Sequence, residues 1–153
     1  MNYKMRALRE KMKSLNLEGM IVTNPINIRY LTNITSEGTL LITRKENIFI
    51  TYTMYIEAVN SVLTINDDII VMDYRDISKE EYENFFTFCE NVGFEENHVT
   101  YKQYKNIKQT YKANELVETE GIIEKQRIIK DEEEMNKIRK ACEITDNCFT
   151  YIR

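Results

Sequence analysis

The sequence is poor in the residues that build compact chemical sites. It has four glycines, one proline, one histidine and no tryptophan. Neither G-x-x-x-x-G-K nor G-x-G-x-x-G occurs, so no phosphate-binding loop is expected. The single histidine, His98, has no second histidine with which to form a spaced metal-ligand pair, and it is predicted to be a turn or packing residue. These absences argue against nucleotide binding and metal hydrolysis within this chain.

The three cysteines, Cys89, Cys142 and Cys148, form no C-x-x-C pair and are odd in number. Disulfides and zinc are therefore poorly supported, and a reducing compartment is the simpler interpretation. Cys89 and Cys142 fall on apolar stripes of predicted helices, which favours buried structural thiols over nucleophiles. No G-x-S-x-G motif suggests a serine nucleophile either.

Long hydrophobic runs are also missing. No apolar stretch approaches the length of a membrane span, and the N-terminal region stays charged through Lys13 without a signal-peptide core. A cytoplasmic protein without a membrane partner is expected. The net charge of −4 argues against a nucleic-acid partner. Residues 101–112 interleave tyrosines with lysines, but the helical spacing of Tyr104, Ile107 and Tyr111 favours an ordinary amphipathic helix over a stacking platform.

What is present is a pattern of alternating helices and strands, which predicts one α/β domain. Apolar spacing predicts helices with the stripes Met5–Leu8–Met12–Leu15, Tyr55–Ala58–Val59–Val62 and Tyr82–Phe85–Phe86–Cys89. Strands are expected at 20–23, 39–44, 47–51, 68–73 and 116–118, the second and third forming a hairpin. Helix starts are expected at Asn24-Pro25 and at capping boxes that begin at Ser78 and Thr100.

The most regular helix is the last one. Asp131 is expected to cap it, with Glu134 in the capping-box position. Its apolar stripe is still running where the chain stops at Arg153, which predicts that the natural protein continues. The stripe consists of Met135, Ile138, Cys142, Thr145, Phe149 and Ile152.

Four ordered blocks together resemble the N-terminal domain of the creatinase/prolidase/aminopeptidase P family. They are IVTNPINIRYLT at 21–32, GTLLIT at 38–43 continuing into FIT at 49–51, VGFE at 92–95 with HVT at 98–100 and QY at 103–104, and RIIKDEEE at 127–134 followed by IRKA at 138–141. Each block alone is weak, but the ordered set is specific and covers nearly the whole chain.

This resemblance implies a three-layer creatinase N-terminal-type domain over residues 1–129, with a mixed sheet of about five or six strands flanked by helices. Residues 130–153 would form a connecting helix toward a missing C-terminal pita-bread metallopeptidase domain. In the family that domain binds two divalent metals, commonly manganese or cobalt, and cleaves the bond before proline in short peptides. Catalytic and metal-ligating residues are therefore expected to be absent from this chain, which alone should catalyse nothing.

The resemblance further implies that this domain helps to form a homodimer and narrows access to the active site. The substrate-access candidates are Asn33, Ser36, Glu37, Tyr52, Met54 and Tyr55. Many family members have a glycine-bearing loop at 33–37 and an Asp-x-Arg-Tyr element at 52–55. Here Tyr52 and Met54 replace the charged pair, either because packing has taken over a structural role or because substrate handling differs.

Two other functions of the same fold remain open at this point. The chain could be a non-catalytic protein-binding module, as in relatives that bind proteins, or the N-terminal domain of a creatinase-like small-molecule hydrolase. Net charge does not separate these from a peptidase.

The absence of a ligand set predicts the result of a metal titration. Isothermal titration of the 153-residue chain with MnCl₂ should give no stoichiometric binding. A saturable one-to-one isotherm that EDTA abolishes would overturn the prediction that the chain holds no metal site.

Overall fold

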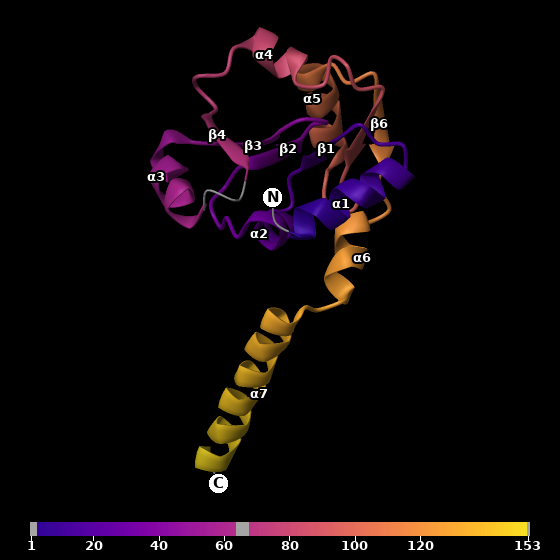
Figure 1. Cartoon of the computed structure of the whole chain (residues 1–153). Coiled ribbons are helices and arrows are strands. Elements are labelled where there is room, and N and C mark those ends of the chain that lie inside the picture. The colour runs from indigo at the N-terminus through magenta and orange to yellow at the C-terminus, as the bar shows by residue number, and fades with distance from the viewer. Residues whose placement is uncertain (1–2, 64–67, 153) are drawn as a thin grey trace. The chain divides into compact units, whose positions relative to one another are not determined.

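The computed structural model describes residues 3–63 and 68–152 and divides into two compact units, Met1–Ile123 and Glu124–Arg153. The first unit is built on a six-stranded mixed sheet with the order β4-β3-β2-β1-β5-β6 (Figure 1). The expected α/β class and mixed sheet are thereby confirmed. The strands are β1 (Gly19–Val22), β2 (Thr39–Ile42), β3 (Asn47–Thr51), β4 (Ile69–Asp73), β5 (Asn91–Phe94) and β6 (Glu115–Glu118).

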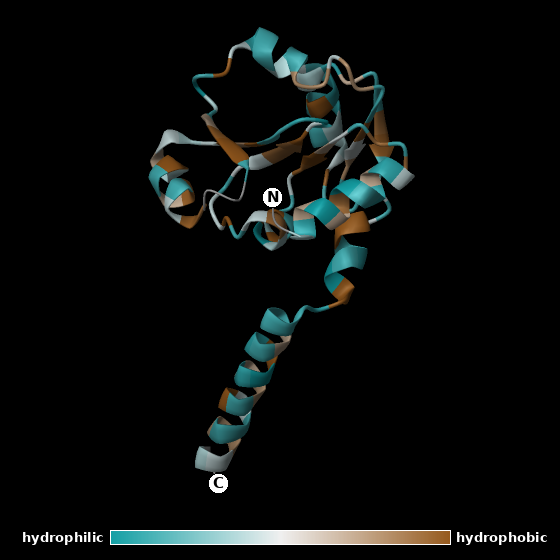
Figure 2. Ribbon diagram, in the orientation of Figure 1, coloured by the Kyte–Doolittle hydropathy of each residue, from teal (hydrophilic) through white to brown (hydrophobic). Residues whose placement is uncertain are grey.

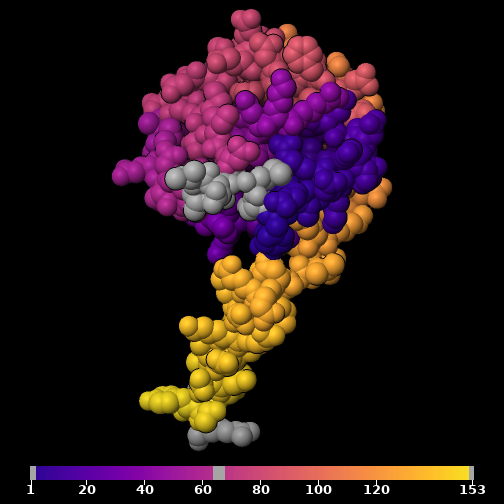
Figure 3. Space-filling view, in the orientation of Figure 1, coloured from indigo at the N-terminus to yellow at the C-terminus, as the bar shows by residue number. Residues whose placement is uncertain are grey.

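Helices cover both faces of this sheet, which makes three layers. One core cluster joins the sheet to the apolar sides of α1, α2, α3 and the start of α6, and a second joins the opposite face to α5 and the segment after α4. The strands are largely apolar while the outer sides of the helices are polar (Figure 2). The N-terminal residues form one continuous indigo patch on the face of the molecule that Figure 3 shows. The helices are α1 (Tyr3–Ser14), α2 (Pro25–Thr32), α3 (Thr53–Val62), α4 (Lys79–Asn84), α5 (Tyr101–Tyr111), α6 (Ile122–Ile128) and α7 (Glu132–Ile152).

The strand directions bring most carboxyl ends of the strands to one edge of the sheet. β2 is antiparallel to both of its neighbours, whereas β1–β5, β5–β6 and β3–β4 are parallel pairs. The carboxyl ends of β1, β3, β4, β5 and β6 therefore lie at the same edge of the sheet, together with the start of β2. We call this the carboxyl edge.

Helix starts follow the predicted capping chemistry. The Asn24 side chain accepts from the Ile26 N–H at 3.0 Å, and Pro25 occupies the first turn of α2. Both expected capping boxes form: the Ser78 hydroxyl accepts from the Glu81 N–H, and the Thr100 hydroxyl accepts from the Gln103 N–H. These local bonds satisfy N–H groups that have no partner within the helix.

In three helices the residues predicted to form the buried face differ from those that the structure buries. Leu15 follows the end of α1 and is exposed, and Leu17 is buried instead. In α3 only Val59 is buried, because the helix lies over the outer strands of the sheet and leaves Ala58 and Val62 exposed. α4 ends at Asn84, so Phe86 enters the core from a turn rather than from a helix.

Two elements were not predicted at all. The segment Asn91–Phe94 forms β5, an inner strand, and Ile122–Ile128 forms α6. Both are short, and β5 contains Gly93, so neither presents a long periodic pattern.

The second unit contains α7, whose predicted capping box is present. The Glu134 N–H donates to Asp131 at 2.7 Å, and the Asp131 N–H donates to Glu134 at 3.0 Å. The apolar stripe is exposed from Met135 through Phe149. Cys142 and Cys148 are exposed free thiols. The expectation of a buried structural thiol therefore holds for Cys89 and is wrong for Cys142. The Ile152 side chain and Arg153 lie outside the described residues.

Among residues 3–63 and 68–152, no helix combines the length and apolar character needed to cross a membrane.

Candidate functional site

The carboxyl edge brings the two groups of predicted access residues together. Because β2 begins where β3 ends, the loop that precedes Thr39 lies beside the segment that follows Thr51. The Thr51 hydroxyl donates to the Glu37 carbonyl oxygen at 2.5 Å. This bond joins the loop 33–37 to the segment 52–55, which the sequence could relate only through family resemblance.

The loop has a fixed path at both ends. Asn33 ends α2 in a left-handed conformation with φ of 61°, and its N–H donates to the Arg29 carbonyl oxygen at 2.8 Å. At the other end Gly38 approaches β3 so closely that a Cβ would overlap the Phe49 ring and come within 2.6 Å of the Ile50 carbonyl oxygen. Between them Ser36 is half-buried and Glu37 is exposed.

The second group divides into surface and anchoring residues. Met54 is 76% exposed and Tyr52 is 51% exposed. The Tyr52 ring lies 5.0 Å from that of Tyr74, a contact that holds it at the surface. Tyr55 is half-buried and packs against the core beneath α3. Tyr52 and Met54 are therefore open to a ligand, whereas Tyr55 supports them.

A polar network that was not predicted from sequence supports this segment from the next strand. Asp73, at the end of β4, lies opposite Thr51 and is buried. It accepts hydrogen bonds from the Thr53 hydroxyl and, at 2.8 Å, from the Arg75 N–H, and the Arg75 guanidinium lies 3.6 Å away. The Thr53 hydroxyl and then the Arg75 N–H and guanidinium lower the pKa of Asp73.

A second carboxylate, also not singled out from sequence, lies where the parallel strands β1 and β5 end. Glu95 is buried and accepts from the Thr23 N–H at 2.7 Å, the Asn24 N–H at 2.8 Å and the Asn27 amide at 2.7 Å. These donors come from the end of β1 and the first turns of α2. Glu95 therefore fixes the start of the helix that leads into the access loop.

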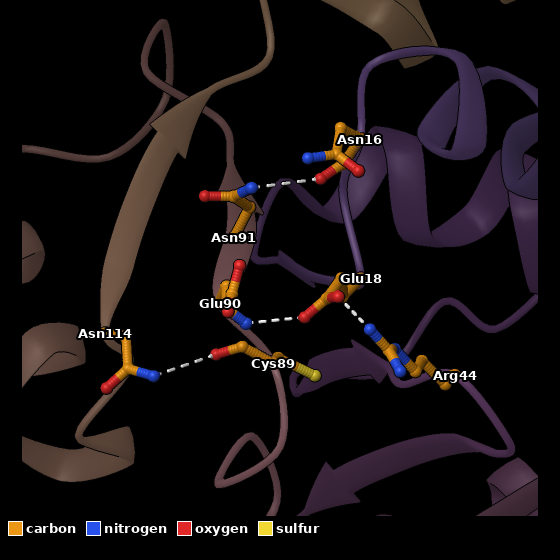
Figure 4. Close-up of polar contacts among 7 residues, drawn as sticks. All are labelled: Asn16, Glu18, Arg44, Cys89, Glu90, Asn91 and Asn114. Carbon is orange, nitrogen blue, oxygen red and sulfur yellow. Dashed lines mark hydrogen bonds and ion pairs between the residues drawn. The ribbon is translucent and has the colours of Figure 1, made fainter.

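Polar contacts also connect the segments at the opposite edge of the sheet, where β1 and β5 begin (Figure 4). The Glu18 carboxylate accepts from the Glu90 N–H at 2.5 Å and pairs with Arg44, and the Asn91 amide donates to the Asn16 carbonyl oxygen at 3.2 Å. Cys89 lies in this region, and burial raises the pKa of its thiol. Because the thiolate is the reactive form, this environment disfavours a nucleophilic role.

Metal-ligating side chains do not gather in the part of the chain that the structure describes. No group of three or more His, Cys, Asp or Glu residues is arranged there to hold an ion. His98 is an exposed turn residue, in agreement with its prediction. What the carboxyl edge offers is two exposed apolar side chains on a rigid polar support, an arrangement that can bind or block a ligand.

Comparison with known proteins gives a consistent result. Residues 4–129 match the family described as the Creatinase/Prolidase N-terminal domain. The chain is 28% identical to an Xaa-Pro dipeptidase from Bacillus anthracis, with a TM-score of 0.85, over 97% of this chain and 42% of that one. A prolidase from Pyrococcus horikoshii OT3 shares the fold, with a TM-score of 0.78 at 23% identity over 97% of this chain and 42% of that one.

Among curated proteins, the uncharacterized peptidase YqhT of Bacillus subtilis (strain 168) is 29% identical over 97% of this chain. The chain spans 42% of the length of that relative.

Removing the charge of Glu95 should weaken the fold. In the parent chain both carboxylate oxygens of Glu95 accept hydrogen bonds. In Glu95→Gln an NH₂ group replaces one of these oxygens, so at least one buried donor loses its acceptor. We expect a loss of about 3 kcal/mol in the free energy of unfolding, measured by urea denaturation with circular dichroism. Glu90→Gln, at an exposed position, should be neutral. Equal stability of Glu95→Gln and the parent chain would contradict the proposed role of this carboxylate.

Asp73 should contribute to stability in a pH-dependent way. A carboxyl group whose folded pKa is lowered stabilises the fold above its unfolded pKa of about 3.9, and this contribution is lost as the pH falls through the folded pKa. Asp73→Asn should therefore lower the urea midpoint at pH 7, and the difference from the parent chain should shrink at pH 2. Asp76→Asn, an exposed carboxyl three residues further on, is the control. A deficit of the same size at both pH values would rule this linkage out.

Proposed function

Because the chain belongs to the creatinase/prolidase N-terminal domain family, we propose that it is the accessory N-terminal domain of a metal-dependent Xaa-Pro peptidase of prolidase or aminopeptidase P type. The observation that carries this proposal is the match to the Bacillus anthracis Xaa-Pro dipeptidase, which covers 97% of this chain and only 42% of that enzyme. The substrates would be short peptides with proline in second position, cleaved in the cytoplasm.

In this proposal the chemistry belongs to the part of the parent protein that this chain does not include. Two divalent metal ions, manganese or cobalt, would supply an activated water there. The described residues of this chain do not fit such a site, because their acidic side chains are dispersed and His98 stands alone at the surface. No catalytic step is therefore assigned to this chain.

The chain's own contribution would be control of access and support of a homodimer. The exposed Tyr52 and Met54 form an apolar rim that would contact peptide beyond the scissile bond. Their support is rigid, since Thr51 ties them to the loop and Asp73 holds Thr53. Asn33, Ser36 and Glu37 would line the adjoining side of the entrance, and Tyr55 would anchor the segment from below.

The exposed stripe of α7 is consistent with a connecting role for residues 130–153. Its apolar side chains would be covered by the remainder of the parent protein, because a stripe of this length is rarely left in water. The boundary between residues 129 and 130 stays a prediction.

The direct test is hydrolysis by the full-length parent protein. Purified with MnCl₂ or CoCl₂, it should release proline from Ala-Pro or cleave before proline in Ala-Pro-Ala, and EDTA should abolish both activities. The 153-residue chain should release nothing. A folded parent that cleaves neither peptide with either metal would favour the protein-binding alternative, and one that hydrolyses creatine would favour the small-molecule hydrolase.

The access role predicts a change in length preference. Replacing the apolar rim in Tyr52→Ala or Met54→Ala should alter kcat/KM for the tripeptide relative to the dipeptide by about threefold or more, because this rim would contact only the longer substrate. Ile26→Ala, at another exposed apolar position, should leave the ratio unchanged. An unchanged ratio in both rim variants would remove these residues from the site.

A further inference from the structure

The two outermost strands of the sheet, β4 and β6, differ in how they are protected against pairing with another strand. β6 carries exposed Glu115 and Glu118 at its ends. β4 at the other edge runs Ile-Ile-Val-Met before Asp73, without lysine or proline, and Ile70 is 46% exposed. Natural proteins commonly place charges, prolines or bulges on an edge to prevent pairing. β4 therefore has the character of a strand that is open to a partner.

The hydrogen bonds between β4 and β3 show which backbone groups of β4 remain to pair with another strand. The Tyr74 N–H donates to the Thr51 carbonyl oxygen at 2.9 Å. Because backbone groups alternate in direction along a strand, those of Ile70 and Met72 also point toward β3. The N–H and C=O groups of Ile69 and Val71 and the N–H of Asp73 then point away from the sheet. The Asp73 carbonyl oxygen already accepts from the Asp76 N–H at 3.1 Å.

We propose that β4 pairs antiparallel with β4 of a second copy of this chain, about a twofold axis at Val71. This register places all five residues of the strand opposite a residue of the partner strand, with the free edge groups of Ile69 and Val71 and the Asp73 N–H facing it. Val71 lies opposite the partner's Val71 in a hydrogen-bonded pair, and Ile70 lies opposite the partner's Met72. Ile70 and Met72 share the face of the sheet on which Met72 packs against the second core cluster. Because the pairing is symmetric, the partner's Met72 covers the exposed Ile70 side chain in both copies.

The charges that flank β4 favour a second copy over an unrelated strand. Asp68 precedes the strand, and Arg75, whose side chain is 72% exposed, follows it. Antiparallel pairing brings Asp68 near the partner's Arg75 at both ends, and no like charges stand opposite each other. A pair of five-residue strands buries less than the ~1,200 Å² of a standard interface, so the dimer is a weak one, with a dissociation constant of roughly 10–100 μM.

This inference rests on the proposed function in one respect: it assigns a surface to the homodimer that the proposed function includes. The test compares three isoleucine-to-lysine variants of the 153-residue chain by sedimentation equilibrium, each checked for folding by circular dichroism. Ile70→Lys places a charge on the β4 edge. Ile26→Lys, on α2, and Ile138→Lys, on α7, place the same charge at positions that are 57% and 44% exposed.

The parent chain should dimerise, Ile70→Lys should weaken dimerisation at least tenfold, and Ile26→Lys and Ile138→Lys should leave it unchanged. Hydrogen exchange at the Val71 amide should slow as the parent chain is concentrated from 5 to about 500 μM, because that N–H becomes bonded in the dimer. A monomeric parent chain at the highest concentration would overturn the proposal. So would a dimer that only Ile138→Lys disrupts, which would assign association to the stripe of α7. Failure of peptide hydrolysis would leave these results unaffected.

Discussion

The arrangement of the carboxyl edge depends on the buried charge of Glu95. Burying a carboxylate is costly unless hydrogen-bond donors replace the water that it loses, and here donors from Thr23, Asn24 and Asn27 do so. Since these donors belong to the turn between β1 and α2, the same bonds set the direction in which α2 leaves the sheet. The helix is eight residues long, or about 12 Å, so its far end and the loop after it are positioned from Glu95.

The loop then reaches β2 under a second constraint, one of space rather than charge. Gly38 passes where any side chain would strike Phe49, and Thr51 fastens the loop to the end of β3. From there the parallel pairing of β3 with β4 places Asp73 under Thr53. Polar bonds thus run along the edge from one strand end to the next, and the apolar side chains Tyr52 and Met54 stand on this support without contributing to it.

Local chemistry made much of the fold predictable. Capping residues marked helix starts, and apolar periodicity marked most strands, because both act within a few residues. The failures have non-local causes. The stripe after Ser78 continues at helical spacing, but the chain turns at Phe85 and places Phe86 against Gly19 in the core. β5 is a strand because it fills the gap between β1 and β6, which no short window of sequence shows.

Non-local contacts also explain why the polar network at the candidate site was not predicted from the sequence. The same network is relevant to the replacement of the family's charged pair by Tyr52 and Met54. The network of Thr53, Asp73 and Arg75 joins residues about twenty positions apart, and only the register between β3 and β4 brings them together. An acidic and a basic side chain are therefore still present at this edge, one strand away from where the family resemblance places them. Asp73 is buried and bonded to Thr53 within the segment 52–55 itself, so the support of that segment is supplied from β4. The backbone of this segment is therefore held without a charged pair inside residues 52–55.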